Sequence, residues 1–396
     1  MALFKNDKKT YNPLMFLAAL WPGWMTVVFF MYLMYLVPRN TSEFPIPTFD
    51  TLKEVCLNVD TSIFMKSVIV FWIVWIIYFA FTHLKLLFWN LKRLKAFRWT
   101  KECKALKWWN TEVTFMSIPL TLAMTINVLF ILWAIFIPKL WVIVEYLFPG
   151  ALVWFALVWV LALKLFSEYF LRLITQKWNA DFVENNNLWQ LISAFAFVMI
   201  AVWFAASSAM STNITTATIW LVASTFFIVL ASSVALLKII VWFNAILKNG
   251  LDESASPTLW IMIPILTLIG ITVVRNMHWL HGHFESEFSA WTYIMFTTVI
   301  VSMQIMFGYI GYVVMKNNWY FEHYIDWKEK NPGSFALICP WVALVVFAFF
   351  FLHLGLVKTW VVDKFSIMYF ILLLPVMYLQ YKTIVTMLKL NKKFGL

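Results

Sequence analysis

The sequence predicts an all-α integral membrane protein with ten transmembrane helices, and three observations lead to that prediction. The chain of 396 residues is 63% hydrophobic and only 12% charged, with a mean hydropathy of +0.81. No soluble domain buries that much apolar surface, so the bilayer must act as the solvent. The apolar runs reach the roughly 20 residues of a spanning helix and do not alternate with a period of two, which excludes a barrel.

The apolar runs divide the chain into ten spans separated by mostly short connections. The two longest connections cover residues 38–63 and 89–109, and neither has the length of a separate soluble domain. We therefore expect residues 1–396 to form a single polytopic membrane domain. The expected spans are 13–37, 64–88, 110–137, 141–168, 187–209, 216–244, 255–275, 287–315, 332–357 and 365–388.

The distribution of basic residues predicts the orientation. Lysine and arginine gather before the first span, in the second connection and after the last span, whereas the first connection is acidic. The positive-inside rule then places both termini in the cytoplasm, in a plasma membrane or bacterial inner membrane. Orientation in the membrane and contact with anionic lipid explain the net charge of +11. A nucleic-acid partner is therefore not expected.

Prolines recur in the spans that run outward. With both termini inside, odd spans run outward and even spans return, which gives five tandem helical hairpins. Four of the five odd spans carry a proline about ten residues past their cytoplasmic start, where it removes one helical hydrogen bond and bends the helix. The fifth span has Phe195 at that level. A repeated bend predicts a central pore of odd helices, surrounded by the even helices and kinked at Pro22, Pro119, Pro264 and Pro340.

Small and hydroxyl residues are more frequent in the odd spans than in the even ones. A weakly polar lining would let an ion pass without holding it tightly. Close helix packing, or hydrogen bonds to the preceding turn, explains the same residues and stays open as an alternative. The candidate lining residues are Thr26, Thr114, Ser117, Thr121, Thr125, Ser193, Thr267 and Gly270.

The outer ends of four odd spans carry a basic residue. A base complements the dipole at a helix C-terminus, which is one explanation for its presence there. If odd helices line a pore, the same bases would surround its outer mouth, concentrate anions and repel cations. These candidate anion-attracting residues are Arg39, Lys139, Arg275 and Lys358.

Several functional classes lack their required residues. No acidic residue lies in the middle of a span, where proton-coupled carriers usually need one. No phosphate loop, nucleophile elbow or zinc motif occurs, so we predict no enzyme activity and no cofactor. His278, His281 and His283 form at most a weak metal-binding cluster, and we predict no metal site. The two intramembrane histidines, His83 and His353, lie near opposite faces and cannot jointly hold a haem.

The architecture resembles the tellurite-resistance/dicarboxylate transporter family, which includes bacterial TehA proteins and plant slow anion channels. The local matches are Phe115-x-x-x-Pro119 and Cys339-Pro340-Trp341. The resemblance implies a passive channel or exporter for small anions such as chloride, nitrate, sulfite or malate, assembled as a homotrimer. It also implies that a phenylalanine on an inner helix closes the pore. Cys339 stands where that phenylalanine is expected, and the candidate gate residues are Phe195, Cys339, Trp341 and Phe335.

Two other functions remain open at this stage. A non-conducting membrane subunit or assembly partner would use its basic cytoplasmic loops to bind another protein. A secondary carrier for anions would more often be built from inverted repeats, whereas repeats that run in the same direction favour a ring-like pore.

Overall fold

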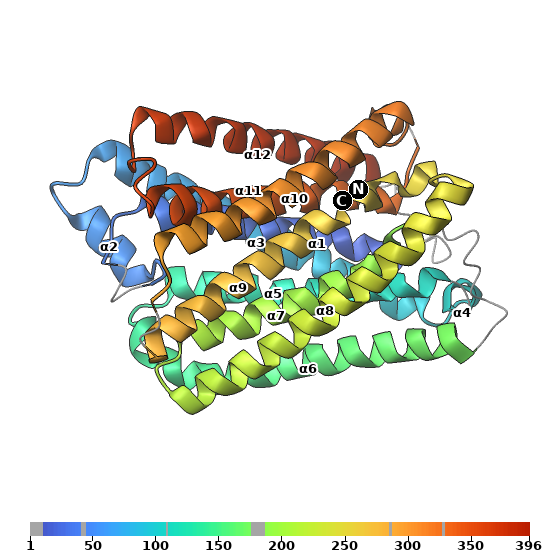
Figure 1. Ribbon diagram of the computed structural model, residues 1–396, viewed down its shortest axis with the longest axis horizontal. Helices are drawn as coiled ribbons and strands as arrows, with labels where there is room; N and C mark the ends of the chain where they lie inside the picture. Colours follow the sequence, from blue (N-terminus) through green and yellow to red (C-terminus); the bar gives the residue numbers. More distant parts are fainter. Residues whose placement is uncertain (1–10, 41–44, 108–109, 176–186, 285–286, 327–328) are drawn as a thin grey trace.

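The computed structural model describes residues 11–40, 45–107, 110–175, 187–284, 287–326 and 329–396. Within these ranges every regular element is helical, and ten helices are long and apolar enough to cross a membrane. The prediction of an all-helical protein with ten membrane-length helices is therefore confirmed. Figure 1 shows these helices running roughly along one axis of the bundle.

Five helices contact one another in a closed cyclic order. We call them the inner helices, and they correspond to the odd spans of the sequence. Each contacts the next, and the last contacts the first: α1 (Phe16–Leu36), α5 (Ser117–Phe136), α7 (Ile192–Met210), α9 (Met262–Phe284) and α11 (Ile338–Phe350). A π-helical segment, Phe351–Val357, continues α11.

The five remaining long helices lie outside this ring, and each contacts the inner helix that precedes it in the chain. In the most apolar stretch of each span, 61–100% of residues are buried for the inner helices but only 17–28% for the outer ones. The exposed apolar surface of the outer helices is suited to lipid contact. They are α3 (Ile63–Phe97), α6 (Leu140–Thr175), α8 (Ile214–Asn249), α10 (Ala290–Asn317) and α12 (Ile367–Phe394).

Each inner helix begins with a 3₁₀ segment, and these segments also contact one another in cyclic order. In four of them an Asn or Asp side chain accepts a hydrogen bond from the backbone N–H two residues ahead, which starts the turn. These residues are Asn12, Asn187, Asp252 and Asn331. The segments are η2 (Pro13–Met15), η3 (Asn110–Met116), η4 (Trp189–Leu191), η5 (Glu253–Ile261) and η7 (Pro332–Leu337).

The prolines lie close to this change of helical geometry. Pro119, Pro264 and Pro340 are each the third residue of their α-helix, and Phe195 is the fourth residue of α7. In the first turn a missing N–H costs little, so these three prolines mark the passage from 3₁₀ to α geometry. Pro22 differs, because it is the seventh residue of α1 and lies inside that helix. The same place in the first turn of the α-helix is thus shared by three of the four prolines.

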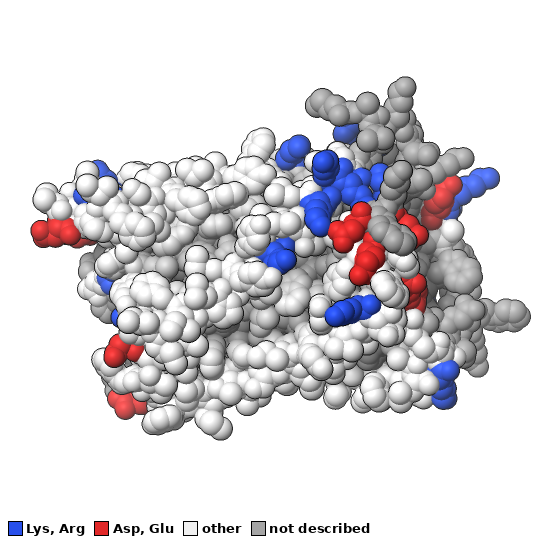
Figure 2. Space-filling view, turned by 90° about the horizontal axis from the view of Figure 1, so that it is seen from above, with Lys and Arg blue, Asp and Glu red and all other residues white. Residues whose placement is uncertain are grey.

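The two ends of the bundle differ in charge. The short helices α2 (Phe49–Leu57) and α4 (Lys101–Lys107) lie at opposite ends (Figure 1). Figure 2 shows Lys and Arg gathered mainly toward one end of the face in view, beside a broad uncharged band. We call the end with α4 and the 3₁₀ segments the cytoplasmic end, following the positive-inside assignment, and the other the outer end.

Candidate functional site

A small cavity lies at the cytoplasmic end of the inner helices. Its volume of about 20 Å³ is enough for one water molecule, so the ring holds no open channel at this level. The cavity brings together two predicted gate residues and two predicted kink residues from three helices. It is lined by Leu17, Trp189, Ile192, Phe195, Thr258, Ile261, Pro264, Ala336, Cys339 and Pro340.

The other two predicted gate residues face the outer helices instead. The ring of Phe335 lies 5.1 Å from that of Phe394 in α12. The indole of Trp341 packs edge-on against Trp260 at 4.5 Å, in a cluster with residues of α10. The structure therefore groups Phe195 and Cys339 at the cavity and separates Phe335 and Trp341 from it.

Above the cavity, the interior of the ring is tightly packed. Phe347 lies seven residues after Pro340 and shares its face of α11, and it is fully buried. Its ring fills the space beside Gly270 of α9, where an added Cβ would lie 2.4 Å from Phe347 Cε2. Gly270, a predicted lining residue, thus packs directly against the ring of Phe347.

Trp24 is a second large side chain on the inner face of α1. It lies seven residues after Leu17, which lines the cavity, and eleven before Tyr35, so these three side chains share one helix face. The indole is 2% exposed, and its N–H has no hydrogen-bond partner among the described residues. A buried N–H donor without an acceptor is costly, so the indole N–H of Trp24 is an unsatisfied donor inside the ring.

The predicted hydroxyl lining is engaged with backbone carbonyls. Ser117 Oγ lies 2.8 Å from the carbonyl of Pro13, Thr121 Oγ1 lies 3.1 Å from that of Phe16, and Thr267 Oγ1 lies 3.1 Å from that of Ala343. These three hydroxyls join neighbouring inner helices. All seven predicted lining hydroxyls also donate a hydrogen bond to a backbone carbonyl three or four residues earlier in the chain. The donors are the side chains of Thr26, Thr114, Ser117, Thr121, Thr125, Ser193 and Thr267.

Arg275 lies on the inner helix α9 near the outer end of the ring. It lies eleven residues after Pro264 and so shares the cavity-lining face of α9. Its Nη1 donates a 2.7 Å hydrogen bond to the carbonyl of Val202 in α7. The same guanidinium acts electrostatically on Tyr35 of α1, which is not adjacent to α9 in the cyclic order. Arg275 of α9 is therefore hydrogen-bonded to α7 and lies within electrostatic range of Tyr35 in α1.

Other cations lie around Arg275. Arg39 also acts on Tyr35, and Lys364 lies within electrostatic range of Arg39. Lys358 Nζ lies 4.0 Å from the ring centroid of Tyr293, a cation–π contact. We call Arg39, Arg275, Lys358 and Lys364 the outer basic cluster.

Three cations of the outer basic cluster have no carboxylate partner among the described residues. Among the described residues, no carboxylate forms an ion pair with Arg275, Lys358 or Lys364. Partial burial lowers the pKa of Arg39, Lys358 and Lys364 below their ordinary values, and the charge of Arg39 lowers that of Lys364 further. The cluster therefore presents positive charge in a partly desolvated setting.

Lys139, the fourth predicted outer base, lies elsewhere. It precedes α6, where its backbone N–H donates a 2.7 Å hydrogen bond to Asp50. His278 lies within electrostatic range of Arg275 and Lys358, and the nitrogen of His283 lies 3.2 Å from the carbonyl of Ser211. In the part of the chain that the structure describes, no group of three or more His, Cys, Asp or Glu side chains could hold a metal ion.

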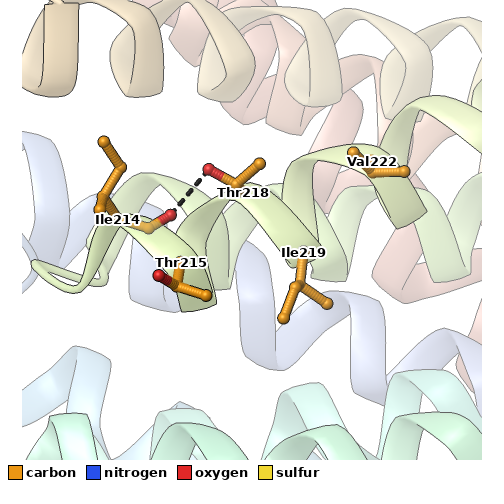
Figure 3. Close-up of a pocket in the computed structure, with 5 residues that line it drawn as sticks. All are labelled: Ile214, Thr215, Thr218, Ile219 and Val222. Carbon is orange, nitrogen blue, oxygen red and sulfur yellow. Dashed lines mark hydrogen bonds between the residues drawn. The ribbon is translucent and has the colours of Figure 1, made fainter.

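A larger hollow of about 490 Å³ lies on the outer surface of α8 (Figure 3). Five residues of the first turns of α8 line it, and no charged side chain is among them. Thr218 is one of them, and its hydroxyl donates a 2.7 Å hydrogen bond to the carbonyl of Ile214. The other lining residues are Thr215, Ile219 and Val222. This hollow lacks the chemistry of an anion site.

Comparison with known proteins adds no family assignment. The chain matches no protein-family model, no curated protein and no solved structure. The arrangement above therefore carries the functional argument alone. Sequence reasoning missed Trp24, Tyr35, Trp189, Phe347 and Lys364. For three of them, the spacing of seven or eleven residues from a neighbour on the same helix face was a usable signal.

Proposed function

We propose that this protein is a passive channel or exporter for small anions of the chloride, nitrate, sulfite and malate class. Its path would follow the axis of the inner helices. The observation that carries the proposal is Arg275, a cation on the cavity-lining face of α9 that has no carboxylate partner among the described residues. An uncompensated positive charge inside a low-dielectric ring attracts anions and excludes cations.

The proposed path has three levels. Anions would gather at the outer basic cluster and meet Arg275 beside Tyr35. They would then pass the packed aromatic level of Trp24 and Phe347, and finally the small cavity bounded by Phe195 and Cys339. Since the last two levels leave no continuous space, the described conformation corresponds to a closed state. The hydroxyls that now bond to carbonyls are available as ligands only after these side chains move.

The aromatic residues along this path support an exclusion role rather than a binding role. Apolar constrictions stop ions because the ion loses its hydration shell there, and they open by small side-chain displacements. Membership of the tellurite-resistance/dicarboxylate transporter family and a homotrimeric assembly are further parts of this proposal. Both derive from the resemblance, and cross-linking in native membranes tests the assembly.

Anion flux from proteoliposomes tests the proposal. The purified full-length protein is reconstituted into liposomes loaded with chloride, nitrate or sulfite, and release is followed under an imposed potassium diffusion potential. We expect release that depends on this potential, and none from liposomes without protein. If Phe195→Ala and Cys339→Ala variants, as well as the wild type, release none of the three anions, the proposal is wrong.

A further inference from the structure

The side chain of Trp189 crosses between two 3₁₀ segments at the cytoplasmic end of the ring. Trp189 belongs to η4, and a Cβ added at Gly333 of η7 would lie 2.6 Å from its Cζ2 and 3.2 Å from its Cη2. In the cyclic order of these segments η5 stands between η4 and η7. The indole therefore spans the ring rather than packing on a neighbour, and only a glycine leaves room for it.

The same indole borders the central cavity. Trp189 lines it together with Phe195 and Cys339, and the segments η5 and η7 complete the lining through Thr258 and Ala336. Cys339 is 3% exposed, so its thiol is almost closed off from solvent. Trp189 belongs to the 3₁₀ segment that precedes α7, so its indole lines the cavity from the side of the cytoplasmic end.

The backbone that carries Trp189 is fixed at two points. The N–H of Trp189 donates a 3.1 Å hydrogen bond to Asn187 Oδ1, and the N–H of Leu188 donates a 3.0 Å hydrogen bond to Thr258 Oγ1 of η5. The partner surface is fixed as well, because Asn331 accepts from the N–H of Gly333 and donates to the carbonyl of Ser254. With both sides held, the available motion is rotation of the indole between staggered rotamers.

We propose that Trp189, seated on Gly333, is the cytoplasmic closure of the central cavity. The role of this closure in transport rests on the proposed anion path. The closure itself can be tested without measuring anion flux. Rotation of the indole off Gly333 connects the cavity, and Cys339 within it, to the cytoplasmic side.

The reactivity of Cys339 tests this closure directly. A small anionic, membrane-impermeant methanethiosulfonate is applied to inside-out and right-side-out vesicles that contain the full-length protein. Modification of Cys339 is then measured by peptide-resolved mass spectrometry. A buried thiol reacts only when it becomes accessible, so we expect about tenfold faster modification in Trp189→Ala, confined to the cytoplasmic side.

The chain offers a matched control. Trp260 packs on Gly311 with an equally close approach, 2.4 Å from an added Cβ, but it joins η5 to the outer helix α10 and does not line the cavity. Trp260→Ala therefore removes the same kind of contact away from the ring interior, and we expect Cys339 to stay protected. Trp189→Phe, which keeps an aromatic ring, serves if the alanine variant does not fold, with an intermediate rate expected.

The outcomes separate this inference from the proposed function. If Cys339 is as protected in folded Trp189→Ala and Trp189→Phe as in the wild type, the closure is elsewhere and the inference is wrong, even if the wild type conducts anions. Equal acceleration by Trp260→Ala also overturns it, because loosened packing then explains the effect. Accelerated labelling confined to the Trp189 variants supports the closure even if no anion flux is found.

Discussion

The two ends of the inner-helix ring differ in how their basic side chains are paired with carboxylates. At the cytoplasmic end, two basic side chains pair with carboxylates: Arg172 of α6 with Glu112, and Lys389 of α12 with Asp326 at 2.8 Å. At the outer end, no described carboxylate pairs with Arg275 or with the two lysines of the outer basic cluster. Paired charges stabilise a fold, whereas unpaired cations keep a positive potential available to a mobile anion.

The two ends also differ in what occupies the ring. At the outer end the Arg275 guanidinium is hydrogen-bonded to the carbonyl of Val202 and lies within electrostatic range of Tyr35, so a charged group lies among the inner helices. At the cytoplasmic end the cavity is almost entirely apolar, and Trp189 bounds it. On the proposed anion path, the outer end would therefore select for charge and the cytoplasmic end would control passage.

Removal of the Arg275 charge should have the largest effect. At an effective dielectric constant of about 20, a unit charge a few ångströms from a passing anion contributes roughly 2–4 kcal/mol. Arg275→Gln removes the charge and keeps an amide donor on a similar stem, so we expect chloride flux from proteoliposomes to fall about ten- to a hundredfold.

Two control variants test whether the charge at position 275 is what matters. Arg275→Lys keeps a cation and should restore much of the flux, whereas Lys139→Gln removes a base outside the cluster and should leave flux near the wild-type level. Unchanged flux in Arg275→Gln would place the anion path away from the ring interior and remove the main support for the comparison.

The packed level between the two ends should be the most sensitive to added volume. In Gly270→Ala the new methyl group would lie 2.4 and 2.7 Å from two carbons of the buried Phe347 ring. Overpacking of this kind costs about 1–3 kcal/mol, so we expect a clear drop in melting temperature in detergent. Gly282→Ala, in the same helix with no atom within 4 Å, should cause no loss. Equal melting temperatures for the two variants would mean that the ring interior is loosely packed.

The sequence predicted more of the scaffold than of the site. Bilayer solvation determines length and composition, so the ten helices could be predicted from apolar runs alone. Their ends were less predictable: α3 continues to Phe97 and α8 to Asn249, past the expected residues 88 and 244. Beyond the apolar stretch the helices carry basic side chains, which can extend into the headgroup region without ending the helix.

The candidate site was predicted only in part, because its contacts lie between segments far apart in the chain. Phe195 and Cys339 were singled out and do meet at the cavity. Trp341 directly follows Pro340 and Phe335 precedes it by five residues, but both side chains lie toward the outer helices α10 and α12. Neither the seat of Trp189 on Gly333 nor the position of Lys364 beside Arg39 follows from any local pattern.

The paired charges of the cytoplasmic end should matter for stability rather than for flux. Glu112 is buried, and its carboxylate accepts a 2.8 Å hydrogen bond from Arg172 Nε. Arg172→Gln leaves that carboxylate without its partner, and since Arg172 is itself about one-third exposed, we expect a loss of about 1–2 kcal/mol. Lys389→Gln breaks the exposed pair with Asp326 and should cost at most about 1 kcal/mol. Reduced flux in Arg172→Gln at unchanged stability would contradict the assigned roles.

The smallest expected effect is a pH dependence set by Lys358. A lysine is charged below its pKa and loses that charge as pH rises through it, and partial burial lowers the pKa of Lys358. Raising the outer pH should therefore reduce chloride flux before exposed lysines titrate, by about two- to threefold if one of several cations is lost. Lys358→Arg keeps its charge and its cation–π contact with Tyr293, so its flux should decline less. The neighbouring Lys364 also has a lowered pKa, and the double variant Lys358→Arg/Lys364→Arg should flatten the profile further. Identical profiles for the wild type and the double variant would show that the lysines of the cluster do not act on the passing anion, leaving Arg39 and Arg275 as its selective charges.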